Sequence, residues 1–180
     1  IDYTHATFGG PGTTDAYESV DPTKEAPELF PSAKVAGGTD LVGDDYDASG
    51  ENGSETPKPD PNPLPCMDHG THVAGTAAGY GVDADGSTFT GDYSTLDGDD
   101  LMDMKVAPGS APKAELYDIK VFGCAGSTAV MAQAMDRTLD PNGDGDFSDK
   151  LDVVNMSVGS DYGAPDDPEA DFVRKLVAND

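Results

Sequence analysis

The stretch from Asp68 to Gly79 constrains the fold of this 180-residue chain more than any other. Asp68 is a favoured N-cap residue, because its carboxylate can accept hydrogen bonds from the free amides of a helix's first turn. The apolar residues behind it recur at helical spacing, and they are Val73, Ala74, Ala77 and Ala78. Gly75 and Gly79 carry no side chain, so this face can approach a sheet closely. The stretch therefore predicts a buried helix with His69 exposed at its start.

Apolar segments on both sides of this helix alternate between strand-like and helix-like patterns. Residues 34–42 and 116–122 have the pattern of strands, and residues 130–139 carry apolar side chains at helical spacing. A hydrophobic strand is expected again over 151–158, followed by an amphipathic helix over 172–177. Strand, helix and strand in succession predict a right-handed crossover with parallel strands, and thus a three-layer α/β fold.

Two polar segments interrupt this pattern, near 43–65 and 81–105. Prolines alternate with other residues at the end of the first, which favours an extended polyproline-like track, and the second is rich in Gly and Asp. We expect both to be surface insertions. Three aspartates of the first segment suggest either calcium ligands or a solvated acidic loop, and the loop is the favoured interpretation: Asp44, Asp45 and Asp47.

The charge of the chain excludes several classes of partner. Ten Lys and Arg stand against 35 Asp and Glu, which gives a net charge of −25. Such acidity argues against binding to nucleic acid or to an anionic membrane, and it suits solubility, bound calcium or a saline medium. No apolar run approaches the roughly 18 residues of a transmembrane helix, so we expect no membrane insertion in this segment. No signal peptide is visible at the start.

The string His-Gly-Thr-His-Val-Ala-Gly-Thr at 69–76 resembles the histidine motif of the subtilisin-like serine proteases (subtilase family, peptidase S8). Further segments agree in the family's order, and they are residues 1–5, 106–108 leading into 114–123, and 152–159. The resemblance implies that residues 1–180 are part of a single subtilisin-like peptidase domain. Its fold would be three-layer α/β with a mainly parallel sheet, incomplete at both ends, so the chain is expected to be an internal fragment.

The resemblance also implies a serine endopeptidase that hydrolyses peptide bonds through an Asp/His/Ser triad. His69 corresponds to the general base, which makes a serine hydroxyl nucleophilic by taking its proton. The aspartate is expected a few residues before Ile1 and the serine beyond Asp180, in a Gly-Thr-Ser-Met-Ala-like string that does not occur here. The parent protein is thus expected to be active, whereas this chain alone is expected to be inactive.

Polypeptide substrates are expected to bind by pairing their backbone with extended edges beside the cleft. By resemblance, the substrate-binding edges are Gly126, Ser127 and Thr128, and Ser157, Val158 and Gly159. The family also implies an extracellular enzyme, secreted or attached to the cell envelope, with further domains in the parent chain.

Composition leaves open whether Cys66 and Cys124 are free thiols or one disulfide. Some members of the resembling family carry a bridge that joins these two places beside the cleft. A disulfide between Cys66 and Cys124 is therefore predicted, and an extracellular location would supply the oxidising environment that it needs.

Residues 140–149 resemble the start of an EF-hand calcium loop, with oxygen-bearing side chains at alternate positions and a glycine at the sixth. The expected ligands of a structural calcium ion are Asp140, Asn142, Asp144, Asp149 and the main chain of Asp146. The twelfth position is Leu151 instead of glutamate, so Asp149 or Asp152 would supply the closing carboxylate. The alternative is a polar loop between helix and strand, and the density of oxygen ligands favours calcium.

Two rival functions remain open from the sequence. One is a noncatalytic calcium-dependent binding module or an inactive protease relative. The other is a metal hydrolase that uses His69 and His72, but zinc proteases space two histidines four apart with a glutamate between them, and no glutamate lies near. We expect His72 instead to make a buried structural hydrogen bond, as the second histidine of the motif does in the family.

Overall fold

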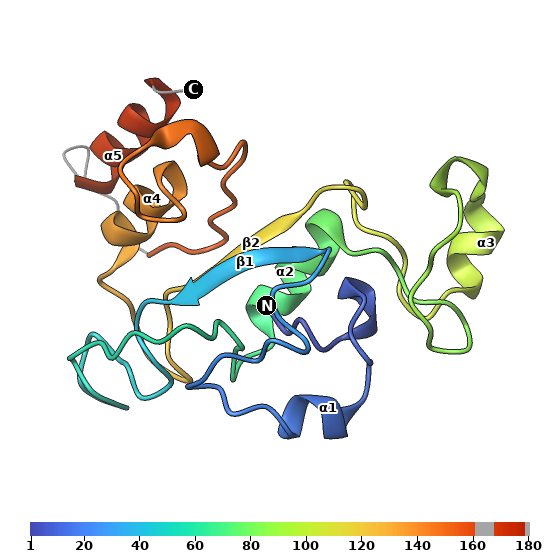
Figure 1. Cartoon of the computed structure of the whole chain (residues 1–180), viewed down its shortest axis with the longest axis horizontal. Helices are drawn as coiled ribbons and strands as arrows, with labels where there is room; N and C mark the ends of the chain where they lie inside the picture. The colour runs from blue at the N-terminus through green and yellow to red at the C-terminus, as the bar shows by residue number, and fades with distance from the viewer. Residues whose placement is uncertain (161–167, 179–180) are drawn as a thin grey trace.

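The computed structural model describes residues 1–160 and 168–178. Helices lie on both sides of a small sheet, and irregular segments connect them (Figure 1). The α-helices are α1 Thr14–Glu18, α2 His69–Ala78, α3 Gly98–Asp103, α4 Met131–Leu139 and α5 Pro168–Ala178. The strands are β1 Val35–Asp40 and β2 Leu116–Lys120. Three short 3-10 helices cover Ala6–Phe8, Tyr93–Thr95 and Phe147–Asp149.

The two strands pair in parallel, with Thr39 opposite Ile119 and Asp40 opposite Lys120. Gly38 lies opposite Asp118, and a Cβ atom on Gly38 would fall 2.4 Å from the Asp118 carbonyl oxygen. The glycine therefore allows the close approach of the strands. Because α2 lies between them in sequence, the arrangement is a β-α-β unit, which confirms the predicted α/β class. The crossover predicted from 116–122 through 130–139 to 151–158 does not form, because 151–158 is not a strand.

Two groups of buried apolar residues form the core. The first joins the N-terminal segment, β1, residue 64 and α2, and contains Tyr3, Phe8, Phe30, Val35, Leu64 and Ala74. The second packs α4 against the end of β1 and the residues after it, and contains Leu41, Val42, Tyr46, Val130 and Ala134. The amphipathic helix predicted over 130–139 thus forms and buries its apolar face. The helix predicted over 172–177 also forms, within α5, which contacts α4.

The helix α2 differs from its prediction in two respects. Only Ala74 and Ala78 are buried, so its other faces are at least partly exposed. Asp68 occupies the N-cap position, but its carboxylate accepts no capping hydrogen bond. The backbone of Asp68 is right-handed helical (φ −83°, ψ −18°), whereas a capping side chain requires an extended residue. The helix makes its close approach at the C-terminal turn to an irregular segment and not to the sheet as predicted: the Gly109 amide donates to the Gly79 carbonyl at 2.9 Å.

The strand predicted over 151–158 is absent from the structure. The Leu151 amide donates to the Thr138 carbonyl at 2.9 Å, which keeps the start of the segment on α4. Beyond it, Val153 is 84% exposed, and Val158 is also exposed. A strand is stabilised by the hydrogen bonds of a neighbouring strand, and among the described residues only β1 pairs with β2. The apolar composition of 151–158 alone is not enough to form the strand.

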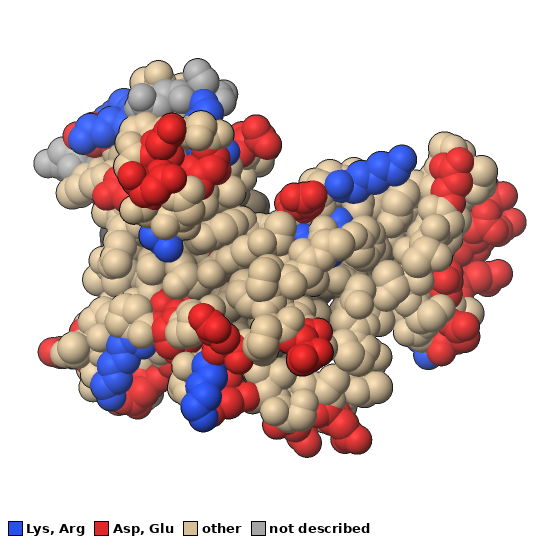
Figure 2. Space-filling view, in the orientation of Figure 1, with Lys and Arg blue, Asp and Glu red and all other residues tan. Residues whose placement is uncertain are grey.

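The predicted insertions differ in burial. In 43–65 the side chains of Tyr46, Asp47 and Leu64 are buried, so part of this segment belongs to the core. Residues 81–105 are mostly exposed and include α3, where the Asp97 carboxylate caps the first turn. Figure 2 shows acidic side chains on several parts of the visible face, including the α3 region at the right. None of the described helices is long and apolar enough to span a membrane.

Candidate functional site

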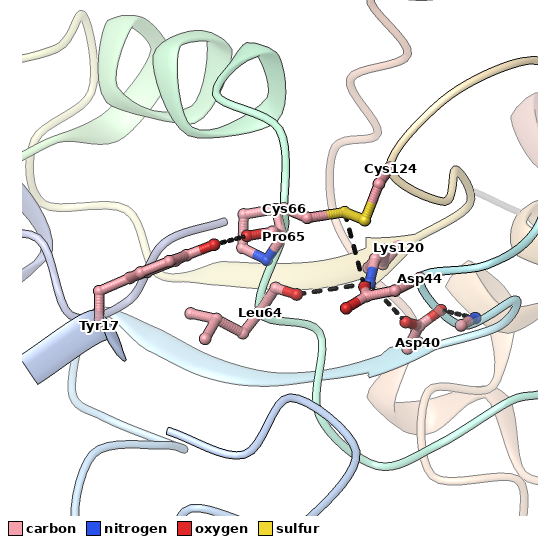
Figure 3. Close-up of a disulfide and its surroundings, with 9 residues drawn as sticks. Tyr17, Asp40, Asp44, Leu64, Pro65, Cys66, Lys120 and Cys124 are labelled. Carbon is pink, nitrogen blue, oxygen red and sulfur yellow. Dashed lines mark hydrogen bonds and ion pairs between the residues drawn. A yellow bond between two sulfur atoms is a disulfide. The ribbon is translucent and has the colours of Figure 1, made fainter. Parts of the chain in front are cut away.

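His69 is the first residue of α2, and its side chain is exposed. Two contacts fix the segment that leads to it (Figure 3), and a third holds the helix itself. The Tyr17 hydroxyl donates to the Pro65 carbonyl at 2.6 Å, and Lys120 Nζ donates to the Leu64 carbonyl at 3.4 Å. The Asp2 amide donates to Thr71 Oγ1 at 2.9 Å, which holds the first turn of α2. The imidazole is therefore presented to solvent from a fixed backbone.

The predicted disulfide is present between Cys66 and Cys124, with Cα atoms 5.3 Å apart. It joins a residue three positions before His69 to one two positions before Gly126. The bridge thus brings the approach to the histidine beside one of the two predicted substrate-binding edges. The sequence separation of 58 residues makes it a long-range constraint.

A buried lysine lies beneath the bridge. Lys120 Nζ is 2.7 Å from Asp40 Oδ2 and also pairs with Asp44 Oδ1 (Figure 3). Burial alone would lower the pKa of Lys120, but its bonds to the two carboxylates outweigh burial and raise the pKa above the usual value. Asp40 Oδ1 accepts the amides of Val42 and Gly43 at 2.8 Å each. Sequence reasoning missed this ionic group, because its members are far apart in the chain.

No described residues form a convincing transition-metal site. One group of three candidate ligands lies within 4.8 Å, consisting of Asp44, Cys66 and Cys124. Its two sulfurs are joined in the disulfide, so they offer no thiolate to a metal. His72, for which a buried hydrogen bond was expected, has an exposed side chain, because it lies on the outer face of α2. The expectation for His72 is therefore wrong.

The two predicted substrate-binding edges lie in different surroundings. Ser127 is bound through its backbone to the segment around Asp47, and the disulfide places it near the His69 segment. Ser157, Val158 and Gly159 are exposed and outside the sheet. The disulfide therefore places the first edge near the His69 segment, whereas the second edge lies outside the sheet.

Asp47 is wholly buried, contrary to the solvated loop favoured by the sequence. Its carboxylate accepts the amides of Ser127, Ser49 and Asn52 at 2.9, 3.0 and 2.9 Å. The Ser127 amide foremost, and then the Ser49 amide, hold the pKa of Asp47 below its usual range. A local pattern could have indicated this turn, since Asp followed two residues later by Ser commonly forms one, but the partner at Ser127 is 80 residues away.

A depression of about 450 Å³ lies beside the start of α2. Its lining includes residues of the N-terminal segment and of the approach to His69, among them Asp2, His5, Tyr17, Cys66, Asp68 and Thr71. The side of the His69 segment that faces the N-terminal residues is thus hollow.

The predicted calcium loop is closed by its own amides. Asp140 Oδ1 accepts the amides of Gly143 and Asp144 at 2.6 and 3.0 Å, and Oδ2 accepts that of Gly145 at 2.9 Å. The Gly145 amide foremost lowers the pKa of Asp140. Asp149 Oδ1 is buried and has no hydrogen-bond partner, which fits a cation ligand. However, the only described group of three His, Cys, Asp or Glu ligands within 4.8 Å lies outside this loop.

The comparison with protein families accounts for nearly the whole chain. The model described as "Peptidase_S8: Subtilase family" matches residues 2–179. No curated protein and no solved structure matches the chain. The match includes the histidine string, the disulfide and both strands.

Proposed function

Because the chain belongs to the subtilase family, we propose that it supplies the general base of a serine endopeptidase, His69. The family supports a serine-peptidase function in general, and the specific role of His69 is our inference. The observation that carries it is the string at 69–76, with the imidazole exposed at the first turn of α2 on a cross-linked approach. An exposed imidazole can take the proton of a serine hydroxyl at neutral pH.

The triad's aspartate and serine would lie in the parent protein outside residues 1–180. The chain alone would then have no serine-peptidase turnover, since the nucleophile is missing. We further propose that residues 1–180 form part of one peptidase domain, that polypeptides are its substrates, and that the parent is extracellular. The bridge between Cys66 and Cys124 supports that location, because disulfides persist in oxidising compartments.

The substrate would pair with Gly126, Ser127 and Thr128 on one side and with Ser157, Val158 and Gly159 on the other. The first edge is supported by its link through Cys124 to the His69 segment. The second is supported by the resemblance alone. It would need to be extended in the complete enzyme, because an irregular segment offers no regular row of donors and acceptors.

A calcium ion would be held by Asp140, Asn142, Asp144 and Asp149, with the main chain of Asp146. The oxygen-rich donor set and the unpartnered Asp149 Oδ1 suit a hard cation. The amides bound to Asp140 do not exclude it as a ligand, because a carboxylate oxygen accepts more than one partner. The ion would supply charge neutralisation in a loop crowded with carboxylates and would take no part in proton transfer.

The test compares two histidine variants of the complete peptidase. His69→Ala should abolish hydrolysis of a generic peptide substrate without unfolding the protein, because an exposed side chain contributes little to packing. His72→Ala is the matched control, since His72 is exposed on the same helix three residues later. Equal effects of the two substitutions on activity would contradict the assignment.

A further inference from the structure

The segment 44–48 lies alongside residues 124–129 and is hydrogen-bonded to them at several points. The Cys124 amide donates to the Asp44 carbonyl at 2.8 Å, and the Ala129 amide donates to the Tyr46 hydroxyl at 3.1 Å. Between these points, Ser127 is held through both of its backbone groups: its amide donates to Asp47 Oδ1 at 2.9 Å, and its carbonyl accepts the Ala48 amide at 3.0 Å. One side of the edge 126–128 is therefore committed to the 44–48 segment.

The side chain of Asp47 connects this edge to its own loop. Oδ1 accepts the Ser127 amide and, at 3.2 Å, the Ser127 hydroxyl. Oδ2 accepts the Asn52 amide at 2.9 Å, and the Ser49 hydroxyl contacts both oxygens at 2.9 and 2.8 Å. A buried carboxylate that accepts several amides is a strong and directional acceptor, so it fixes the position of its donors.

The shape of the edge is matched to this carboxylate. Gly126 has a left-handed backbone with φ of +84°, and a Cβ atom there would lie 2.1 Å from Asp47 Cγ. No side chain larger than hydrogen fits at position 126 while Asp47 keeps its place. The glycine and the aspartate are therefore one packing unit, although 79 positions separate them.

We propose that Asp47 is a positioning residue for substrate: by holding Ser127 it presets the edge at 126–128 to pair with an extended polypeptide. In an extended chain, successive residues direct their backbone groups to opposite sides. The backbone groups of Ser127 are bound to residues 47 and 48, so in an extended edge the backbone groups of Thr128 would be directed to the opposite side, where a substrate would lie. This inference rests on the proposed function. It adds a residue that touches neither the substrate nor the reacting atoms.

A positioning role predicts a dependence on substrate length. The complete peptidase is assayed with two p-nitroanilide substrates that share the residue at the cleaved bond, one with a single residue and one with four. Asp47→Ala should lower kcat/KM for the longer substrate by roughly tenfold or more, mainly through KM, because the edge loses a charge-assisted anchor. For the single-residue substrate, which does not reach the edge, the change should be less than about threefold.

The conservative variant separates positioning from general stability. Asp47→Asn keeps an oxygen to accept the Ser127 amide but places an NH2 group where the Asn52 amide donates. It should therefore be less stable than the wild type but retain most of the preference for the longer substrate. Ser49→Ala is the matched control on the loop side, since it removes hydroxyl bonds to Asp47 and leaves those of Ser127.

A second variant covers the case in which Asp47→Ala does not fold. Gly126→Ala would displace the Asp47 carboxylate and should give the same selective loss with the longer substrate. Equal losses for both substrates, or no loss in a folded variant, would overturn the positioning role. Wild-type activity in a folded His69→Ala variant would instead refute His69 as the general base, so failure of the proposed function and failure of the positioning role give different results.

Discussion

Replacing both Cys66 and Cys124 with alanine opens the bridge and restores freedom to the unfolded chain. The bridge closes a loop of 58 residues. In the chain-entropy treatment, a loop of this length lowers the entropy of the unfolded state by about 14 cal/mol/K, or about 4 kcal/mol at 25 °C. This is a large fraction of the roughly 5–15 kcal/mol by which ordinary domains are stable.

The assay is guanidinium unfolding of the oxidised wild type and the double alanine variant, followed by circular dichroism. The free energy of unfolding should fall by about 4 kcal/mol. Reduced and alkylated wild type should behave as the variant does, and reductant should leave the variant unchanged. A difference below about 1 kcal/mol would refute the reasoning, since the cross-link would then constrain an unfolded state that is already ordered.

Three further predictions concern buried or clustered charges. Lys120→Ala should destabilise the chain by about 3–5 kcal/mol in the same assay, because it leaves the buried Asp40 carboxylate without its cation; a loss below 1 kcal/mol would contradict this. In the complete peptidase, a calcium chelator should lower the melting temperature, and Asp144→Ala should reproduce part of that loss and reduce the calcium stoichiometry; no change in either would mean that the loop is only a polar turn. The stability advantage of the wild type over Asp47→Asn should be full above the ordinary carboxyl pKa of about 4 and should shrink as the pH falls toward the lower pKa of the folded state; a constant advantage in acid unfolding curves would contradict it.

Local sequence patterns predicted the helices and strands that show a clear apolar pattern in their own residues. Helical spacing located α4, because a single apolar face decides both the period and the burial of that helix. The positions of β1 and β2 were predicted by the strand-like patterns at 34–42 and 116–122, but their pairing with each other was not. Residues 151–158 have a similar composition, but they form no strand, since hydrogen bonding across strands depends on a neighbour that no local pattern specifies.

The residues of the candidate site also include some that the sequence predicted and some that it did not. The position of His69 at the start of α2 could be predicted, because the motif is contiguous. The roles of Asp47 and Lys120 could not be predicted from the sequence. Asp47 binds Ser127 and Lys120 pairs with Asp40, and each partner lies 80 residues away in the chain. In an acidic sequence, a single buried aspartate has no local feature that separates it from the many exposed ones. The pairing of Cys66 with Cys124 was predicted by family resemblance and not by spacing.

The most direct test of the proposed function is the rate of peptide hydrolysis by the complete peptidase after His69→Ala, beside His72→Ala and the wild type. Loss of the general base should lower kcat by roughly a million-fold, the size known for subtilisin, a member of this family. His72→Ala should stay within about threefold of the wild type, because its exposed side chain is not assigned to the reaction. A folded His69→Ala variant with wild-type turnover would contradict the assignment of His69 as the base.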